Sequence, residues 1–340
     1  MTNQVNFAIL INMKAPKTLQ DAILYFSNAD NCLQYMVDRR WPDGIVVCPN
    51  CGRTDPTFLK SQGKWQCKSA HVKRQFSVKV GTIFEDSPLG LEKWLPAVWL
   101  ITNAKNGISS YELSRSLGVT QKTAWFMLHR IREAMKQDTS HKFGFGGPVE
   151  SDETYVGPNP QRMHKDRKAR YQAQRGQGMR GDVYVGKTAV HGMLDRELRQ
   201  VRANVLTNVK RETLQNAILE NVTPFASVYT DEFAAHDGLE KQFIHKVVNH
   251  SMEYVRGNVH TQGIENFWSL LKRGLRGTYV AVEPFHLDRY VSEQVFRFNN
   301  RATKENPLTD EDRFACVLMQ AVGKRLTYAE VTGKDGTTCN

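Results

Sequence analysis

The sequence contains no apolar run long enough to cross a membrane as a helix. Its N-terminus, MTNQVNFAILINMKAP, also lacks the charged start, long apolar stretch and small-residue cleavage site of a secretory signal. Both absences argue against a membrane or secreted protein. We therefore expect a cytoplasmic protein that has no membrane partner.

Cysteine is sparse, with six residues in a chain of 340. Three of them, Cys48, Cys51 and Cys67, fall within twenty positions, and the others are scattered. This distribution differs from the dense, even pattern of a secreted disulfide scaffold. Metal binding is the better interpretation of the cluster.

Acidic residues are fewer than basic ones. Forty-six Lys and Arg stand against thirty-five Asp and Glu, which gives a formal net charge of +11. A basic excess favours a polyanionic partner, nucleic acid or an anionic membrane surface, although it says nothing about the fold. A basic loop around Arg167 adds to this charge.

The chain has no internal repeats, and its character changes several times along its length. Its 340 residues allow two or three domains. The glycine-rich stretch HKFGFGGP marks a boundary, and the strand and helix signals beyond it predict a mixed α/β domain. We expect an N-terminal helical segment at 1–44, a small β module at 45–84, a helical module at 88–140, a linker at 141–148, the α/β domain at 149–305 and a C-terminal tail at 306–340.

The β module carries two short-spaced pairs of metal-ligand residues. Cys48 and Cys51 form C-x2-C, and Cys67 and His71 form C-x3-H after fifteen intervening residues. Zinc takes four tetrahedral nitrogen or sulfur ligands, and such a site stabilises a module with almost no core. The alternative is a set of ordinary small buried residues, with His71 a solvated loop histidine. The alternating segment QFSVKVGTIF also predicts a strand in this module.

The helical module has the pattern of a helix-turn-helix. SSYELSRSLG ends at Gly118, and Thr120 can cap the following QKTAWFMLHRIREAMK. The second helix would bury an apolar stripe and leave His129, Arg130 and Arg132 outside it. In the DNA-binding interpretation, the outward residues that contact DNA are Gln121, Lys122, Thr123 and Arg130. Many helix-turn-helix pairs bind no DNA, which remains the alternative.

Three carboxylates beyond the linker are candidate metal ligands. Asp152 lies in the strand ESDETYVG, Asp231 ends the strand SVYTDEF, and Glu265 lies near the start of the helix HTQGIENFWSLLKRGLRGTYV. Each has a bland alternative as a turn former, a helix cap or part of a solvated face. If they converge, their oxygen ligands suit Mg²⁺ or Mn²⁺.

The helix that carries Glu265 is also basic. Lys272 lies seven residues, or two turns, after Glu265 on the same face, so one end of the face could bind a metal and the other a phosphate. Arg273 and Arg276 follow it. Trp268 shares this face, and we expect it to be core rather than a platform for an unpaired base.

In this order, the motifs resemble the DDE transposases of bacterial insertion sequences, specifically the ISXO-like group with an N-terminal zinc ribbon. The resemblance runs from about Leu19 to about Tyr328. It rests on RWPDG before CPNCG, FSVKVGTIFEDS, HRIREAM, SDETYVG, VYTDEF, VNHS, HTQGIENFWSLLKRGLRGTY and HLDRYVSEQVFRFNNR.

This resemblance implies a multidomain α+β protein: a zinc ribbon, a helix-turn-helix, and then a ribonuclease-H-like catalytic domain. Asp152, Asp231 and Glu265 would hold two Mg²⁺ or Mn²⁺ ions for DNA cleavage and strand transfer. Lys272 would be the family's downstream basic residue, and Arg297 would contact DNA or brace its helix. The implied partners are double-stranded DNA of the element ends and target, and at least one further copy of the chain. The implied location is the bacterial cytoplasm, at the nucleoid.

The sequence departs from the family pattern in two places. The second knuckle is usually C-x2-C, whereas here it is Cys67-x3-His71. Some members place asparagine in the role of the third acid, so Gln262 is a rival to Glu265. Competing functions are a DNA-binding regulator without activity and a nuclease of the same fold. A serine or tyrosine recombinase ranks last: Tyr155 or Tyr290 could be proposed as its nucleophile, but neither lies in the arginine-rich setting that this chemistry requires.

Overall fold

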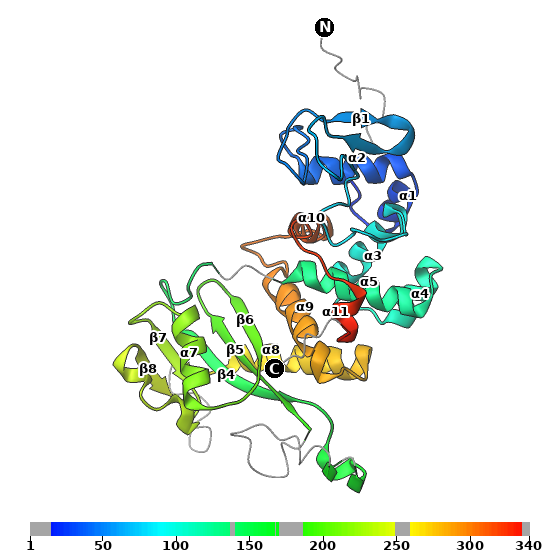
Figure 1. The fold of residues 1–340 in the computed structure, drawn as a ribbon. Helices are drawn as coiled ribbons and strands as arrows, with labels where there is room; N and C mark the ends of the chain where they lie inside the picture. Colours follow the sequence, from blue (N-terminus) through cyan, green and yellow to red (C-terminus); the bar gives the residue numbers. More distant parts are fainter. Residues whose placement is uncertain (1–14, 137–139, 167, 170–185, 249–258, 335–340) are drawn as a thin grey trace. The chain divides into compact units, whose positions relative to one another are not determined.

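The computed structural model describes residues 15–136, 140–166, 168–169, 186–248 and 259–334 (Figure 1). The described residues form two compact units. The first comprises 15–104, 110–134 and 302–325, and the second comprises 105–109, 135–301 and 326–334, with the gaps given above. No helix in these ranges is both long and apolar enough to span a bilayer.

The first unit begins with two capped helices, α1 (Leu19–Phe26) and α2 (Ala29–Arg40). The Thr18 side chain accepts a hydrogen bond at the start of α1, and the Asn28 side chain does the same for α2. Their aromatic side chains pack with Phe314 of α10 (Asp310–Gln320). The segment expected as a tail therefore includes a core helix of this unit, together with α11 (Tyr328–Thr332) in the second.

The β module is a three-stranded antiparallel sheet of β1 (Thr57–Leu59), β2 (Lys64–Gln66) and β3 (Gln75–Phe76), with the short η1 (Lys60–Gln62) in between. The longer strand predicted from QFSVKVGTIF is wrong beyond Phe76. Consecutive turns follow, with backbone hydrogen bonds from Val80 to Ser77 and from Thr82 to Lys79. Phe76 and Val78 are still buried, so the alternation of apolar residues predicted which side chains are buried but not how far the strand extends.

Three helices follow: α3 (Leu91–Asn103), α4 (Ser110–Leu117) and α5 (Gln121–Met135). Gly118 adopts φ +63° between α4 and α5, a conformation that suits glycine, and the Thr120 hydroxyl caps α5 through the Thr123 N–H. The predicted helix-turn-helix is therefore present.

Three polar side chains of α5 do not lie where the apolar stripe suggested. His129, Arg130 and Arg132 are all buried, at 3% exposure or less. The Arg130 guanidinium lies over the rings of Trp94 and Phe126 and donates to a backbone carbonyl. Burial lowers its pKa to about 10. The prediction that Arg130 faces outward to DNA is wrong, because packing surrounds α5 on more than one side.

The second unit is built on a five-stranded sheet in the order β6-β5-β4-β7-β8. β4 and β5 are antiparallel, as are β5 and β6, whereas β4 runs parallel to β7 and β7 to β8. This is the ribonuclease-H-like arrangement predicted above. The strands are β4 (Val149–Val156), β5 (Thr188–Asp195), β6 (Gln200–Leu206), β7 (Ser227–Thr230) and β8 (Ile244–Val247).

Helices cover both faces of this sheet (Figure 1). On one face α7 (Arg211–Asn221) packs through Ile218 against Met193 and Val228. On the other, α8 (Gln262–Gly274) and α9 (Leu287–Asn299) pack against Val190 and Leu194. A π-helical turn, η6 (Leu275–Tyr279), extends α8, and short 3-10 turns are η2 (Pro160–Arg162), η4 (Ala234–His236), η5 (Leu239–Lys241) and η7 (Pro284–His286).

The N-terminus of α8 is fixed to the sheet by a buried carboxylate. Glu150 of β4 accepts the backbone N–H of Ile264 at 2.8 Å and pairs with Arg196 at 2.6 Å. A carboxylate is favoured at the positive end of a helix dipole, and this one is also neutralised by an arginine. These contacts hold the N-terminus of α8 against β4.

Candidate functional site

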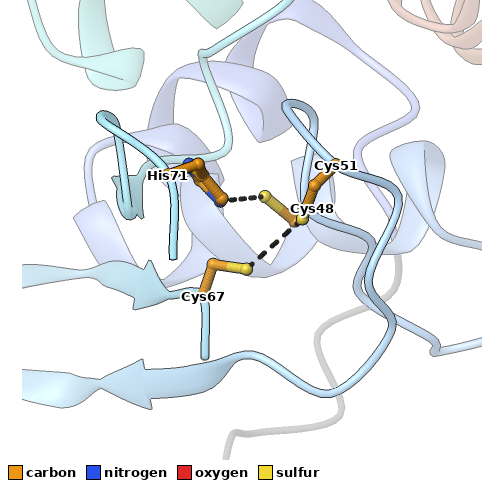
Figure 2. A group of neighbouring side chains, drawn as sticks. All are labelled: Cys48, Cys51, Cys67 and His71. Atoms are coloured by element: carbon orange, nitrogen blue, oxygen red, sulfur yellow. Dashed lines mark hydrogen bonds between the residues drawn. The ribbon is translucent and has the colours of Figure 1, made fainter. Parts of the chain in front are cut away.

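The four candidate zinc ligands lie together in the first unit, as Figure 2 shows. Cys48 and Cys51 come from the loop before β1, and Cys67 and His71 follow β2. All four ligand atoms lie within 4.8 Å of one another. His71 therefore belongs to the cluster and is not a separate loop histidine.

The cluster has the dimensions of a tetrahedral zinc site. Cys51 Sγ lies 3.5 Å from Cys67 Sγ, and Cys48 Sγ lies 3.5 Å from His71 Nε2. Zinc bonds of about 2.0–2.3 Å at tetrahedral angles place neighbouring ligand atoms roughly 3.5–3.8 Å apart. The backbone N–H of Arg53 lowers the pKa of the Cys51 thiol, which favours the thiolate that binds metal. The donor set and spacing fit zinc.

In the second unit, two of the candidate carboxylates come from neighbouring strands. Asp152 lies on β4, and Asp231 directly follows β7, which runs parallel to β4. The pKa of Asp152 is raised to about 7, first by burial and then by the negative charges of Glu153 and Asp231. A nearby cation would stabilise the ionised form of this carboxyl group.

Asp152 is tied to helix α8. The Trp268 indole N–H donates to Asp152 Oδ2 at 3.0 Å, and the Glu153 backbone N–H donates to Oδ1 at 2.8 Å. Gly192, which pairs with Asp152 in β5, leaves room for the indole: a Cβ there would lie 2.5 Å from the Trp268 ring. Trp268 is buried, which confirms its predicted place in the core.

Glu265 lies on α8 one turn before Trp268 and is exposed, and the Thr261 hydroxyl donates to its Oε1 at 3.0 Å. Residues three apart on a helix are neighbours on its surface, so Glu265 lies on the face of α8 from which Trp268 donates to Asp152. Gln262, also exposed, is the first residue of the helix. The assignment of Glu265 or Gln262 as the third ligand stays a prediction.

The structure adds two histidines that the motif analysis missed. His236 Nε2 lies 3.5 Å from Glu153 Oε1 and 3.8 Å from Asp231 Oδ1, and His191 Nε2 lies 3.9 Å from the same Glu153 oxygen. Among the described residues, Glu153, Asp231 and His236 form a group whose ligand atoms all lie within 4.8 Å of one another, and neither Asp152 nor Glu265 belongs to it.

Burial and charge set the ionisation of this group. Burial lowers the pKa of His191 to about 4. Burial acts the same way on His236, but Glu153, Asp231 and Asp152 outweigh it and raise its pKa. One signal in the sequence pointed here: His191 is a polar residue inside the apolar strand TAVHGMLD, opposite Glu153 in register.

Three basic residues lie at the end of α8 and in the turn that follows it: Lys272 and Arg273 on the helix, and Arg276 in η6. Lys272 is half-buried, and burial and the charge of Arg276 lower its pKa, while Asp152 acts in the opposite direction. Arg273 and Arg276 are exposed. Lys272 and Arg276 line a cavity of about 250 Å³ together with the end of β4. Most of the basic loop around Arg167 lies outside the described residues.

Arg297 does not face solvent. Its guanidinium forms a buried ion pair with Glu293, to which the Tyr279 hydroxyl also donates. Burial alone would lower the pKa of Arg297, but the Glu293 charge raises it. Of the two predicted roles of Arg297, this pairing supports helix bracing, because Glu293 links the Arg297 guanidinium of α9 to Tyr279 in the turn after α8. A contact of Arg297 with DNA stays a prediction.

The outward residues of α5 keep their predicted role as a proposal. Gln121 donates to the Ser110 hydroxyl at 2.8 Å, Lys122 is exposed, and the Thr123 hydroxyl lies 2.8 Å from that of Thr120. All three lie in the first turn of the second helix, the part that enters a groove in DNA-bound helix-turn-helix proteins.

Known families match two parts of the chain. Residues 144–299 match the ISXO2-like transposase domain, and residues 27–71 match the transposase zinc-ribbon domain. A Halobacterium salinarum relative, an uncharacterized protein in transposable element ISH50, is 32% identical over 246 residues, which cover 69% of this chain and 79% of the relative. An uncharacterized transposase-like protein of Haemophilus influenzae is 37% identical over 101 residues, 29% of this chain and 81% of its own.

Among solved structures, a chain of the simian T-cell lymphotropic virus intasome in complex with PP2A regulatory subunit B56 gamma matches at a TM-score of 0.29. The identity is 14%, and the match covers 61% of this chain and 70% of that chain. The strand order described above, and not this weak likeness, defines the fold of the second unit.

Proposed function

Because the chain belongs to the ISXO2-like transposase family, we propose that it binds the terminal inverted repeats of an insertion sequence and catalyses DNA cleavage and strand transfer. The observation that supports catalysis most directly is the state of Asp152. Its pKa is raised by burial and by two neighbouring carboxylates, among them Asp231 on the adjacent parallel strand. Carboxylates kept close against their own repulsion are typical of a divalent-cation site.

In this proposal Asp152 and Asp231 hold the catalytic ions, with Glu265 as the third ligand. Mg²⁺ or Mn²⁺ held there would supply activation of a water for strand cleavage and stabilisation of the leaving 3′ oxygen, and the freed 3′-OH would then attack target DNA. The Trp268 indole holds Asp152 in one orientation through its hydrogen bond. Such a hydrogen bond reduces the reorganisation needed when the substrate binds.

The basic end of α8 would hold the DNA backbone beside this site. Lys272 interacts electrostatically with Asp152 and lines the adjacent cavity, so a phosphate placed there would lie next to the metal ligands. Arg273 and Arg276 extend the positive surface toward the rest of the strand. Phosphate contacts of this kind position DNA without reading its sequence.

End recognition is assigned to the first unit. The Cys48, Cys51, Cys67 and His71 cluster would hold one structural zinc ion, and the first turn of α5 would present Gln121, Lys122 and Thr123 to the major groove. Joining two element ends to one target requires both ends in one complex, so we include at least a dimer on DNA.

A strand-transfer assay tests the proposal. Purified protein is mixed with Mg²⁺ or Mn²⁺, a labelled duplex that carries the flanking inverted repeat, and a supercoiled plasmid. Glu265→Gln and Gln262→Ala are run in parallel as matched changes on the same helical turn. We expect joined product from the parent and from Gln262→Ala, and none from Glu265→Gln.

The assay also separates the competing functions. Specific binding without cutting or joining under either metal would favour the regulator. Cutting without joining would favour a nuclease of the same fold. Loss of joining only in Gln262→Ala would move the third ligand to Gln262 while leaving the transposase assignment in place.

A further inference from the structure

The group of Glu153, Asp231 and His236 lies apart from the Asp152 carboxylate. Successive residues of a strand point to opposite faces of the sheet, so Glu153 faces the α7 side while Asp152 faces α8. His191, opposite Glu153 on β5, shares its face. Asp231, at the end of β7, is the residue through which this group adjoins Asp152.

Two members of the group are deeply buried, and they contact one another as an ion pair at 3.5 Å, which is longer than a good hydrogen bond. His236 is 1% exposed, and the Glu153 side chain is 5% exposed. Within the described part of the chain, both ring nitrogens of His236 and Oε1 of Glu153 lack a hydrogen-bond partner. Buried polar groups that make only long contacts recover less than the roughly 1–3 kcal/mol that a good partner returns, so a set that converges on one point in this way has room for a ligand between its members.

The separations suit a metal ion. His236 Nε2 lies 3.5 Å from Glu153 Oε1 and 3.8 Å from Asp231 Oδ1. Metal bonds of about 2.1 Å to nitrogen and oxygen place neighbouring ligand atoms roughly 3.0–3.4 Å apart, so a small inward movement of the three side chains closes the site. Asp231 is 36% exposed at its side chain and gives an ion a route of entry.

We propose that Glu153, Asp231 and His236 form a metal site of their own, which takes a first-row divalent ion such as Mn²⁺ in preference to Mg²⁺. Two carboxylates and one imidazole are a donor set that Mn²⁺ and Zn²⁺ accept, whereas Mg²⁺ prefers oxygen ligands alone.

The other polar contacts in the group agree with this assignment. The Phe233 backbone N–H donates to Asp231 Oδ1 at 3.1 Å, which orients the carboxylate and leaves a lone pair of that oxygen available. His191 is not a fourth ligand, because its Nε2 lies 2.9 Å from the Ser151 hydroxyl. The inference shares Asp231 with the proposed function but does not depend on DNA joining.

The test is Mn²⁺ binding, without DNA, to the full chain loaded with a single equivalent of zinc for the Cys48, Cys51, Cys67 and His71 cluster. Free Mn²⁺ is followed by electron paramagnetic resonance during a titration of the parent, His236→Gln and His245→Gln. His245 is the matched control, since its Nε2 lies 2.9 Å from the Thr230 hydroxyl, next to Asp231, and does not belong to the ligand group. We expect His236→Gln to weaken one class of Mn²⁺ site at least tenfold and His245→Gln to leave it unchanged.

A second measurement needs no variant and covers the case in which His236→Gln fails to fold. Pulsed electron paramagnetic resonance of the Mn²⁺-loaded parent should show nitrogen coupling from a directly bound imidazole. Absence of this coupling, or equal Mn²⁺ affinity in folded His236→Gln and the parent, would overturn the site. Asp152→Asn should keep the nitrogen coupling, so a failed strand-transfer assay and a failed metal site give different results.

Discussion

At the scale of single residues, the surroundings of Asp152 disfavour its ionised carboxylate, which is the form that would bind a metal ion. Its pKa is about 7 in the folded protein, against an ordinary value of 3.8, because burial and neighbouring charges disfavour the carboxylate. At low pH Asp152 is neutral, and the neutral form increases the free energy of unfolding. That contribution is lost as the pH rises from about 4 through 7.

We predict that Asp152→Asn, which cannot ionise, is more stable than the parent at pH 8 in Mg²⁺-free buffer. A shift of this size is worth up to about 4 kcal/mol, and the difference should vanish near pH 4. Urea unfolding at both pH values measures it. Asp237→Asn, at an exposed carboxylate, is the control and should change little at either pH. An Asp152→Asn variant that is less stable than the parent at pH 8 would contradict the argument.

The residues that sequence reasoning missed are those whose meaning depends on topology. Asp152 and Asp231 could be named in advance, because each ends or interrupts a short strand motif. His236 and Glu153 are 83 positions apart in the chain, and only the parallel pairing of β4 with β7 brings them together. A local pattern contains no information about such a contact.

At the scale of elements, the strands and helices of the second unit could be predicted, because their alternation and periodicity are strong. The errors fall where the local pattern of apolar residues in the sequence does not match the burial found in the structure. The alternation after β3 continues through turns, and α5 buries one histidine and two arginines that a single apolar stripe placed outside. Packing on several sides of one helix is a tertiary effect, which no window of the sequence shows.

The three-stranded ribbon is the element whose stability we expect to depend most on metal. Its strands have two or three residues each and bury only a small aromatic core around Trp65, so a bound metal should supply much of its stability. We predict that Cys48→Ser combined with Cys51→Ser lowers the zinc content of the purified protein by one equivalent and weakens specific end binding. Elemental analysis and a gel-shift assay measure the two effects.

The control for this change is Cys316→Ser, at a half-buried cysteine of α10 that lies outside the ligand cluster. It should retain both zinc and end binding. Unchanged zinc content in the double variant would refute the assignment of the ribbon as a zinc site, whatever happened to DNA binding.

At the scale of the whole molecule, recognition and chemistry are assigned to different compact units. The ligand cluster and α5 belong to the first unit almost entirely, whereas Asp152, Asp231 and α8 belong to the second. A change confined to one unit should therefore affect one step and spare the other. The two steps remain linked through the single DNA molecule on which both act.

Asp231→Asn tests this separation. The change removes one negative charge and a metal ligand but no basic residue, so we predict unchanged affinity for the element ends and a loss of cleavage of at least a hundredfold. A gel shift at fixed salt gives the first quantity, since phosphate contacts make affinity depend on ionic strength, and cleavage of a labelled end gives the second. Equal loss of both would place Asp231 in the DNA contact and not in the chemistry, whereas loss of cleavage alone is what a metal ligand at the end of β7 requires.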